Sequence, residues 1–186
     1  MHARLVIALL VIAALIGPAA ASLGARAAPA GLLLSVDDLK IVVGGQDNSD
    51  SDKVTFSGSF TWLETPSETT PDNWDVNFVL GFVGMAPIYA VFIPMGSLTM
   101  GGGDWDLTKE GKDMTRLNSF SIARGDVAGR WDFRLSDPGL RISAFTPPAD
   151  PLVAIEGSVA ITLGGFPYVA TALIAMEQRG SNWVSV

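Results

Sequence analysis

The stretch Lys53-Val-Thr-Phe-Ser-Gly-Ser-Phe-Thr-Trp62 alternates apolar and hydroxyl-bearing residues along most of its length. Successive side chains of a β-strand point to opposite faces, so this alternation predicts a strand with one buried and one solvated face. The pattern returns at Arg130–Ser136, where Trp131, Phe133 and Leu135 share one parity. Two half-buried strands of this kind predict an all-β protein.

The segment Val76–Gly103 contains no charged residue. Strands buried on both faces lose the apolar–polar alternation, so this segment predicts strands that are covered on both sides. A transmembrane helix is the alternative for so long a run, but glycine and proline interrupt it and its β-branched and aromatic residues favour strands. A second hairpin is expected within Leu152–Met176 around Gly164-Gly165, because glycine accepts the positive φ angles of a tight turn.

Two polar segments are expected to lie outside the strands. Asp104–Asp113 is rich in polar and turn-forming residues, and Asp137-Pro138-Gly139 predicts a turn. No segment keeps a helical period over a useful length, so no helix is expected.

The two halves of the chain resemble each other at an offset of about 80 residues. Each half contains a strand pair, a proline-bearing loop, an uncharged hairpin and an ending with glycine and tryptophan. We therefore expect one domain at 28–186 with two four-strand units, 36–107 and 117–186, although chance similarity between β-rich segments also explains the match.

Neither four-strand unit is expected to bury its apolar face alone. The predicted fold is therefore an antiparallel β-sandwich of about eight strands. A small barrel, either water-soluble or lipid-exposed, is the alternative. The expected core contains Phe56, Phe60, Trp131, Phe133, Val159, Ile161 and Leu163.

The beginning of the chain has the order of a secretory signal peptide. Arg4 precedes the apolar run Leu5–Gly17, and small residues follow. Cleavage is expected after Ala25-Arg26-Ala27, which makes 1–27 the signal, with Ala19-Ala20-Ala21 as the second site. An uncleaved anchor is the alternative, but the run is shorter than the ~20 residues of a spanning helix. The expected location is extracytoplasmic.

Charge and composition exclude several classes of function. The chain has 12 basic and 19 acidic residues; without 1–27, which holds two arginines and no acid, 10 basic and 19 acidic residues remain, a net charge of −9. This balance argues against nucleic acid as a partner and against stable membrane insertion after cleavage. The chain has no cysteine, and its one histidine is His2, so triads, thiolate nucleophiles and histidine metal sites are excluded from the processed chain.

Two clusters are candidate binding sites. Asp104, Trp105 and Asp106 predict a sugar site, in which the indole ring stacks on a sugar and the carboxylates accept hydrogen bonds from its hydroxyls. A core tryptophan is the alternative, because Trp183 occupies the matching place in the second half. Asp47, Asp50 and Asp52 lie in a run of oxygen-bearing side chains that resembles a calcium loop. No glutamate closes the loop, and a solvated turn is the alternative.

These observations predict a secreted, non-enzymatic protein that acts as an extracellular binding or structural module. Its expected partner is an extracellular protein or a glycan, and no cofactor is expected apart from calcium. A carbohydrate-binding module that uses Trp105 with Asp104 and Asp106 is the first alternative. A hydrolase that uses carboxylates alone is the second, since two acids suffice for glycoside hydrolysis.

Overall fold

The computed structural model describes residues 31–43, 52–64, 70–140 and 152–186. Two short helical elements, η2 (Pro71–Asn73) and α2 (Lys109–Thr115), accompany the strands. The strands are β1 (Leu32–Val42), β2 (Asp52–Trp62), β3 (Asp75–Phe82), β4 (Pro87–Ile93), β5 (Leu98–Gly101), β6 (Asp104–Leu107), β7 (Ser119–Arg124), β8 (Arg130–Leu140), β9 (Leu152–Leu163), β10 (Phe166–Arg179) and β11 (Asn182–Ser185).

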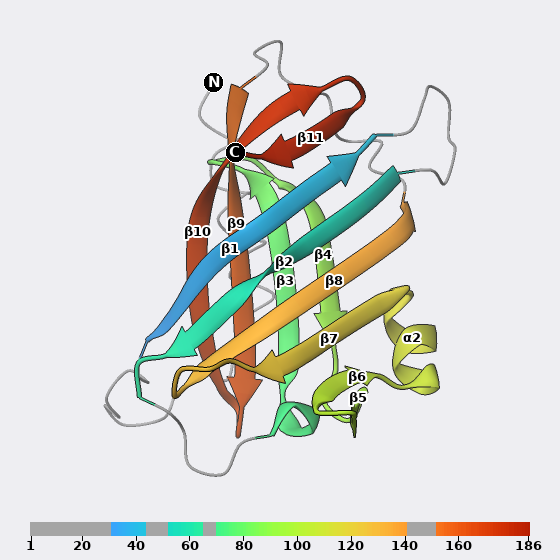
Figure 1. Ribbon diagram of the computed structural model, residues 1–186, viewed down its shortest axis with the longest axis vertical. Helices are drawn as coiled ribbons and strands as arrows, with labels where there is room; N and C mark the ends of the chain where they lie inside the picture. The colour runs from blue at the N-terminus through green and yellow to red at the C-terminus, as the bar shows by residue number, and fades with distance from the viewer. Residues whose placement is uncertain (1–30, 44–51, 65–69, 141–151) are drawn as a thin grey trace, which may run out of the picture.

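All 11 strands belong to one antiparallel sheet, in the order β4-β3-β9-β10-β11-β1-β2-β8-β7-β6-β5. The sheet curls into a half-barrel, so that β1, β2, β8 and β7 form an inclined layer in front of the steeper β10, β9, β3 and β4 (Figure 1). The short strand β11 joins the two layers by pairing with β1 on one side and β10 on the other.

The prediction of an antiparallel all-β protein is confirmed. The strands form one continuous curled sheet, whereas the sequence predicted two separate sheets. The sequence predicted about eight strands, and three of those described, β5, β6 and β11, have only four residues each. Strands this short carry too few residues for alternation to reveal them.

The core lies between the two layers. Phe133 on β8 contacts Phe56 on β2 and Phe78 on β3, with ring centroids 5.1 and 5.0 Å apart. The predicted core residues are buried, except that Leu163 is half-buried against the same cluster. The alternation in β2 therefore identified the inner face correctly.

Gly58 allows β2 to pass close to β1. A Cβ atom at this position would lie 2.2 Å from the backbone oxygen of Ser35. The register between the two strands shifts between Val36 and Asp38, directly beside Gly58. Because Gly58 has no side chain, it leaves space for the bulged backbone of β1 beside it.

The turn predicted at Asp137-Pro138-Gly139 is wrong, because β8 continues to Leu140. Pro138 lies opposite Lys53, and the register shifts between Asp52 and Lys53. Proline is accommodated in a sheet where a bulge interrupts the ladder of hydrogen bonds. The extension matters because it carries Asp137 onto the inner face of the sheet.

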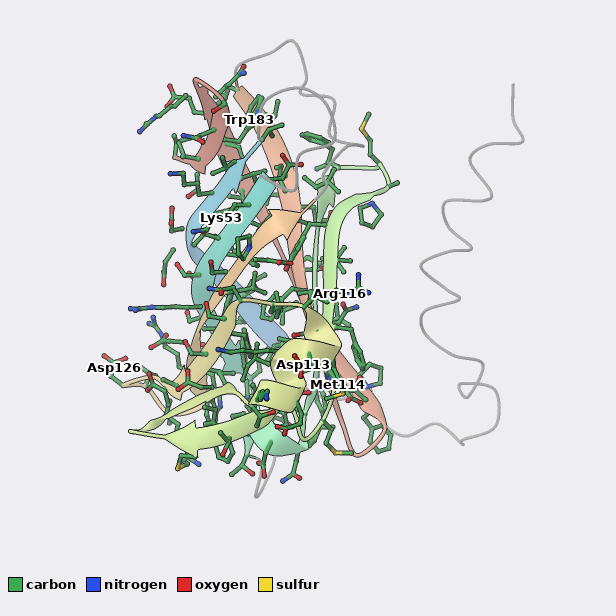
Figure 2. The ribbon with its side chains drawn as sticks, turned by 90° about the vertical axis from the view of Figure 1, so that its right-hand side faces the viewer. Lys53, Asp113, Met114, Arg116, Asp126 and Trp183 are labelled. Carbon is green, nitrogen blue, oxygen red and sulfur yellow. The ribbon has the colours of Figure 1, made fainter. Side chains whose placement is uncertain are left out.

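The polar segment Asp104–Asp113 forms β6 and the start of the seven-residue helix α2, which the sequence did not predict. Thr108 caps the helix, since its Oγ1 accepts a 2.8 Å hydrogen bond from the Gly111 amide. Arg116 ends the helix in the left-handed region, at φ 61°. The helix contacts β4 and β6, and Figure 2 shows it beside the sheet with Asp113 and Met114 labelled.

The strand order relates the two halves of the chain. The hairpin β1–β2 lies beside β8–β7, and β4–β3 lies beside β9–β10, so that β2 pairs with β8 and β3 pairs with β9. The internal repeat and the limits of the domain remain predictions. Among the described residues, the structure contains no helix with the length and apolar character needed to cross a membrane.

Candidate functional site

The candidate sugar site lies on β6, near one end of the sheet. Trp105 is half-buried and packs against the hydrophobic core, opposite Ile122 on β7 and Met100 on β5. Asp104 and Asp106 are exposed. Since they have the other parity of the strand, the structure places these two carboxylates on the face opposite the indole ring. A sugar stacked on Trp105 would therefore not meet them directly.

Of the candidate calcium ligands, only Asp52 is among the described residues; Asp47 and Asp50 lie outside them. Asp52 begins β2 and is buried, with 7% of its surface exposed. Within the described part of the chain, no group of three or more acidic or histidine side chains could hold a metal ion. The calcium proposal therefore depends on residues that the structure does not describe.

A buried carboxylate that the sequence analysis did not select lies inside the half-barrel. Asp137 follows Trp131, Phe133 and Leu135 in the inward parity of β8 and is 6% exposed. The Tyr89 hydroxyl donates a 3.2 Å hydrogen bond to Asp137 Oδ2. Because Tyr89 belongs to β4 and Asp137 to β8, this contact crosses the core between the two layers.

The surroundings of this pair disfavour charge. Burial raises the pKa of the Asp137 carboxyl, and the hydrogen bond from Tyr89 lowers it in part. Burial and the neighbouring carboxylate both raise the pKa of the Tyr89 phenol, which therefore keeps its proton at neutral pH. The neutral Tyr89 hydroxyl donates its hydrogen bond to the Asp137 carboxylate, and this contact links the two layers of the sheet.

The outer face of the inclined layer is polar and charged. We call the outward residues of β1, β2, β8 and β7 the charged face; Lys53 marks it in Figure 2. Arg130 and Asp132 form an ion pair there, with 2.8 Å between Nε and Oδ1. Lys40, Thr55, Ser57, Thr61, Arg134 and Ser136 complete the central part of this face.

The outer face of the steeper layer has a different composition. Its outward positions alternate with the buried residues of β4, β3, β9 and β10, and the ladder pairs place them side by side. We call this surface the apolar face; it consists of Asn77, Val79, Gly81, Ala90, Phe92, Ala154, Glu156, Ser158, Ala160, Val169, Thr171, Leu173 and Ala175.

Glu156 is the one charged residue of the apolar face. Phe92, Val169 and Leu173 project from it and are 55%, 52% and 70% exposed. Small, half-buried side chains such as Ala160 and Ser158 lie on the same face. Single exposed apolar residues are ordinary on a protein surface, but a contiguous apolar patch indicates an interaction site.

This finding corrects the expectation that Val76–Gly103 forms strands covered on both sides. The inward residues of β3 and β4 are buried, whereas Ala90 and Phe92 on the outward side of β4 are exposed. No described element of the chain lies over the apolar face, which is on the right-hand side of the sheet in Figure 2. The absence of charged residues in Val76–Gly103 predicted that another element covers the outer side of these strands. The described part of the chain contains no such element.

The sequence matches no known protein-family profile and no curated protein, and the fold matches no solved structure. The candidate surfaces therefore have to be judged on their own chemistry.

Two features that the sequence analysis missed, the buried Asp137 and the apolar face, nevertheless have a signal in the sequence. Asp137 continues the alternation of Arg130–Ser136 by one inward position, a signal that the Pro138-Gly139 pair concealed. The apolar face follows from two hairpins with few charged residues, β3–β4 and β9–β10, that lie side by side. The sequence showed both hairpins, but their adjacency depends on a contact between β3 and β9 that alternation cannot predict.

Proposed function

We propose that the protein is a non-enzymatic, extracytoplasmic module that works by holding another protein surface against its apolar face. The observation that carries this proposal is the contrast between the two outer faces of one sheet. The charged face carries ions and hydroxyls, as a solvated surface does. The apolar face has one charged residue, Glu156, and three projecting apolar side chains.

The expected extracytoplasmic location agrees with this role. A signal peptide at 1–27 would export the domain, and mass spectrometry of the exported protein should then find a chain that starts near Ala28. Recovery of an intact N-terminus in a membrane fraction would refute cleavage of the signal peptide and a soluble mature protein, and it would leave the proposal for the apolar face unaffected.

Site-specific photocrosslinking in the organism that makes the protein tests the apolar face. A photoreactive phenylalanine analogue replaces Val169 on the apolar face or, as a matched control, Leu33 on the outer side of β1, which is 56% exposed. We expect a discrete crosslinked species from position 169 and none from position 33. Absence of a species from position 169, or equal yields from both positions, would refute the proposal.

A carbohydrate-binding module is the alternative that uses Trp105. The half-buried indole leaves part of its ring accessible beside the exposed Met100. Asp104 and Asp106 point away from that ring, so the ring alone would have to hold the sugar. A glycan array with the native protein and Trp105→Ala tests this alternative.

A carboxylate-only hydrolase is the second alternative, and one observation favours it. Asp52 and Asp137 are both buried on neighbouring strands β2 and β8, near the same end of the sheet. Two inward carboxylates are the minimum for glycoside hydrolysis. Because both are buried and Tyr89 already binds Asp137, a substrate would need to open the core. A hydrolysis screen with Asp52→Asn and Asp137→Asn tests this alternative.

A further inference from the structure

We infer that the occupant of the apolar face is a second copy of this chain, so that two sheets stack face to face in a symmetric dimer. This inference rests on the proposed function and names its partner. A symmetric dimer uses the same patch on both subunits, so the patch must complement itself in size and in chemistry. Both requirements can be examined residue by residue.

The size of the apolar face allows a small interface of this kind. Four strands at ~4.8 Å spacing give a width of roughly 19 Å. The face spans Asn77–Gly81 of β3 and Ala154–Ala160 of β9, which are roughly 17 and 23 Å long at ~3.3 Å per residue. The projected area is thus roughly 300 to 450 Å², and the accessible area is larger because side chains project from it. A standard stable interface buries about 800 Å² on each partner, so we expect a dimer that depends on protein concentration.

The polar groups of the face also complement one another. Glu156 is a carboxylate that needs hydrogen-bond donors once it leaves water. The face offers neutral donors in Asn77, Ser158 and Thr171, at outward positions of β3, β9 and β10. A second copy therefore supplies donors for the carboxylate without any basic residue, and its apolar side chains cover Phe92 and Leu173.

Charge disfavours the other surfaces that an apolar sheet face could meet. Asp75 lies beyond one end of the apolar face, and Glu177 lies beyond the other, where it forms an ion pair with Arg179. The remaining charged residues of this region, Asp75 and Glu156, are both acidic. Anionic lipid headgroups would be repelled by these carboxylates. The charged face of a second copy would bury its arginines against apolar side chains, which is costly. Apolar face against apolar face is the arrangement that leaves both charged faces in water.

Sedimentation velocity of the purified full-length mature protein over a micromolar concentration series tests the inference. We expect a dimer, and we expect Leu173→Glu to raise its dissociation constant at least about tenfold, because it adds like charge beside Glu156 in both copies. Leu33→Glu is the matched control, since it places the same charge on an exposed leucine of the other layer, 56% exposed against 70% for Leu173, and should leave the dimer unchanged. Val169→Glu is a second disrupting variant, and thermal melts establish that each variant is folded.

A photoreactive residue at position 169 of the purified protein locates the contact. The crosslinked product should have twice the mass of the chain, and its peptides should join position 169 to β3, β4, β9 or β10. A monomer at every concentration, or a dimer that Leu173→Glu and Val169→Glu leave unchanged, would refute the inference. If the purified protein is monomeric while position 169 still forms a specific crosslink in the organism, the proposed function stands with a different protein partner.

Discussion

The Tyr89 hydroxyl and the Asp137 carboxylate meet inside the core, 3.2 Å apart, although their strands lie far from each other in the sheet. Both residues are 6% exposed. The hydrogen bond joins β4, which ends one side of the sheet, to β8 in the opposite layer. It is a polar link between the two layers in a core that consists mainly of aromatic and aliphatic side chains.

Replacement of Asp137 by asparagine should change the pH dependence of stability. Burial raises the pKa of Asp137 in the folded protein, so the folded state binds this proton more tightly than the unfolded chain does. The contribution of the group to stability therefore falls as the pH rises above the ordinary carboxyl pKa of about 3.9. The native protein should lose this contribution as the pH rises from 4 to 7, whereas Asp137→Asn should not. The free energy of unfolding of the variant should therefore rise relative to that of the native protein over this range, as measured by urea denaturation.

Asp113→Asn, on the exposed helix α2, controls for the loss of a carboxylate in general (Figure 2). It should follow the native protein across the same pH range. An Asp137→Asn variant that also runs parallel to the native protein would show that burial does not raise the pKa of this carboxyl.

Tyr89→Phe should lower the free energy of unfolding by about 1–3 kcal/mol at neutral pH, because it leaves a buried carboxylate without its donor. The double variant Tyr89→Phe/Asp137→Asn should lose less than the sum of the single changes, since the two side chains act on each other. Urea denaturation of all four proteins measures this coupling, and strictly additive losses would contradict the contact.

Trp105→Ala should lower stability by about 2 kcal/mol, roughly half the loss expected for a fully buried tryptophan, because Trp105 is half-buried. Asp104→Asn and Asp106→Asn should each change stability by less than about 0.5 kcal/mol, since both side chains are exposed on the other face. Chemical denaturation measures the three variants. A Trp105→Ala protein of native stability that no longer binds glycans would instead favour the carbohydrate-binding module.

Phe133→Ala should cost about 3–5 kcal/mol, because it removes a buried ring that contacts Phe56 and Phe78 and leaves a cavity. Phe92→Ala removes the same side chain from the exposed apolar face and should cost less than about 1 kcal/mol in the monomer. Guanidinium denaturation at low protein concentration compares the two, and equal losses would show that the assignment of inner and outer faces is wrong.

Gly58→Ala should destabilise the protein by more than about 2 kcal/mol, since the new Cβ would meet the backbone oxygen of Ser35 at 2.2 Å. Gly157→Ala is the matched control in another strand. Its Cβ would lie 2.9 Å from the terminal Cδ1 of Ile174, a side-chain end that can rotate away. Thermal unfolding should rank Gly58→Ala well below Gly157→Ala, and the reverse order would contradict the close approach of β1 and β2.

Local alternation identified the strands and their inner faces where strands are long. Phe56, Phe60 and Phe133 were predicted to face the core and are buried, and Gly164-Gly165 was predicted to form the turn that joins β9 to β10. The same reasoning missed α2, because a seven-residue helix with a glycine inside has no measurable period. Reasoning from local sequence also predicted a turn at Pro138. The bulge that accommodates this proline forms between β8 and β2, and local sequence does not show which strands pair.

The all-β class, the inward residues of the long strands, the acidic charge and the lack of cysteine could be predicted from the amino-acid sequence, since these depend on residue type and on neighbours along the chain. Which faces meet became known from the three-dimensional fold. It brought Tyr89 to Asp137, turned Asp104 and Asp106 away from Trp105, and joined the β3–β4 and β9–β10 hairpins into one exposed apolar face. Contacts of this kind depend on how distant strands pair and how the sheet curls, and the alternation within one strand carries no record of either.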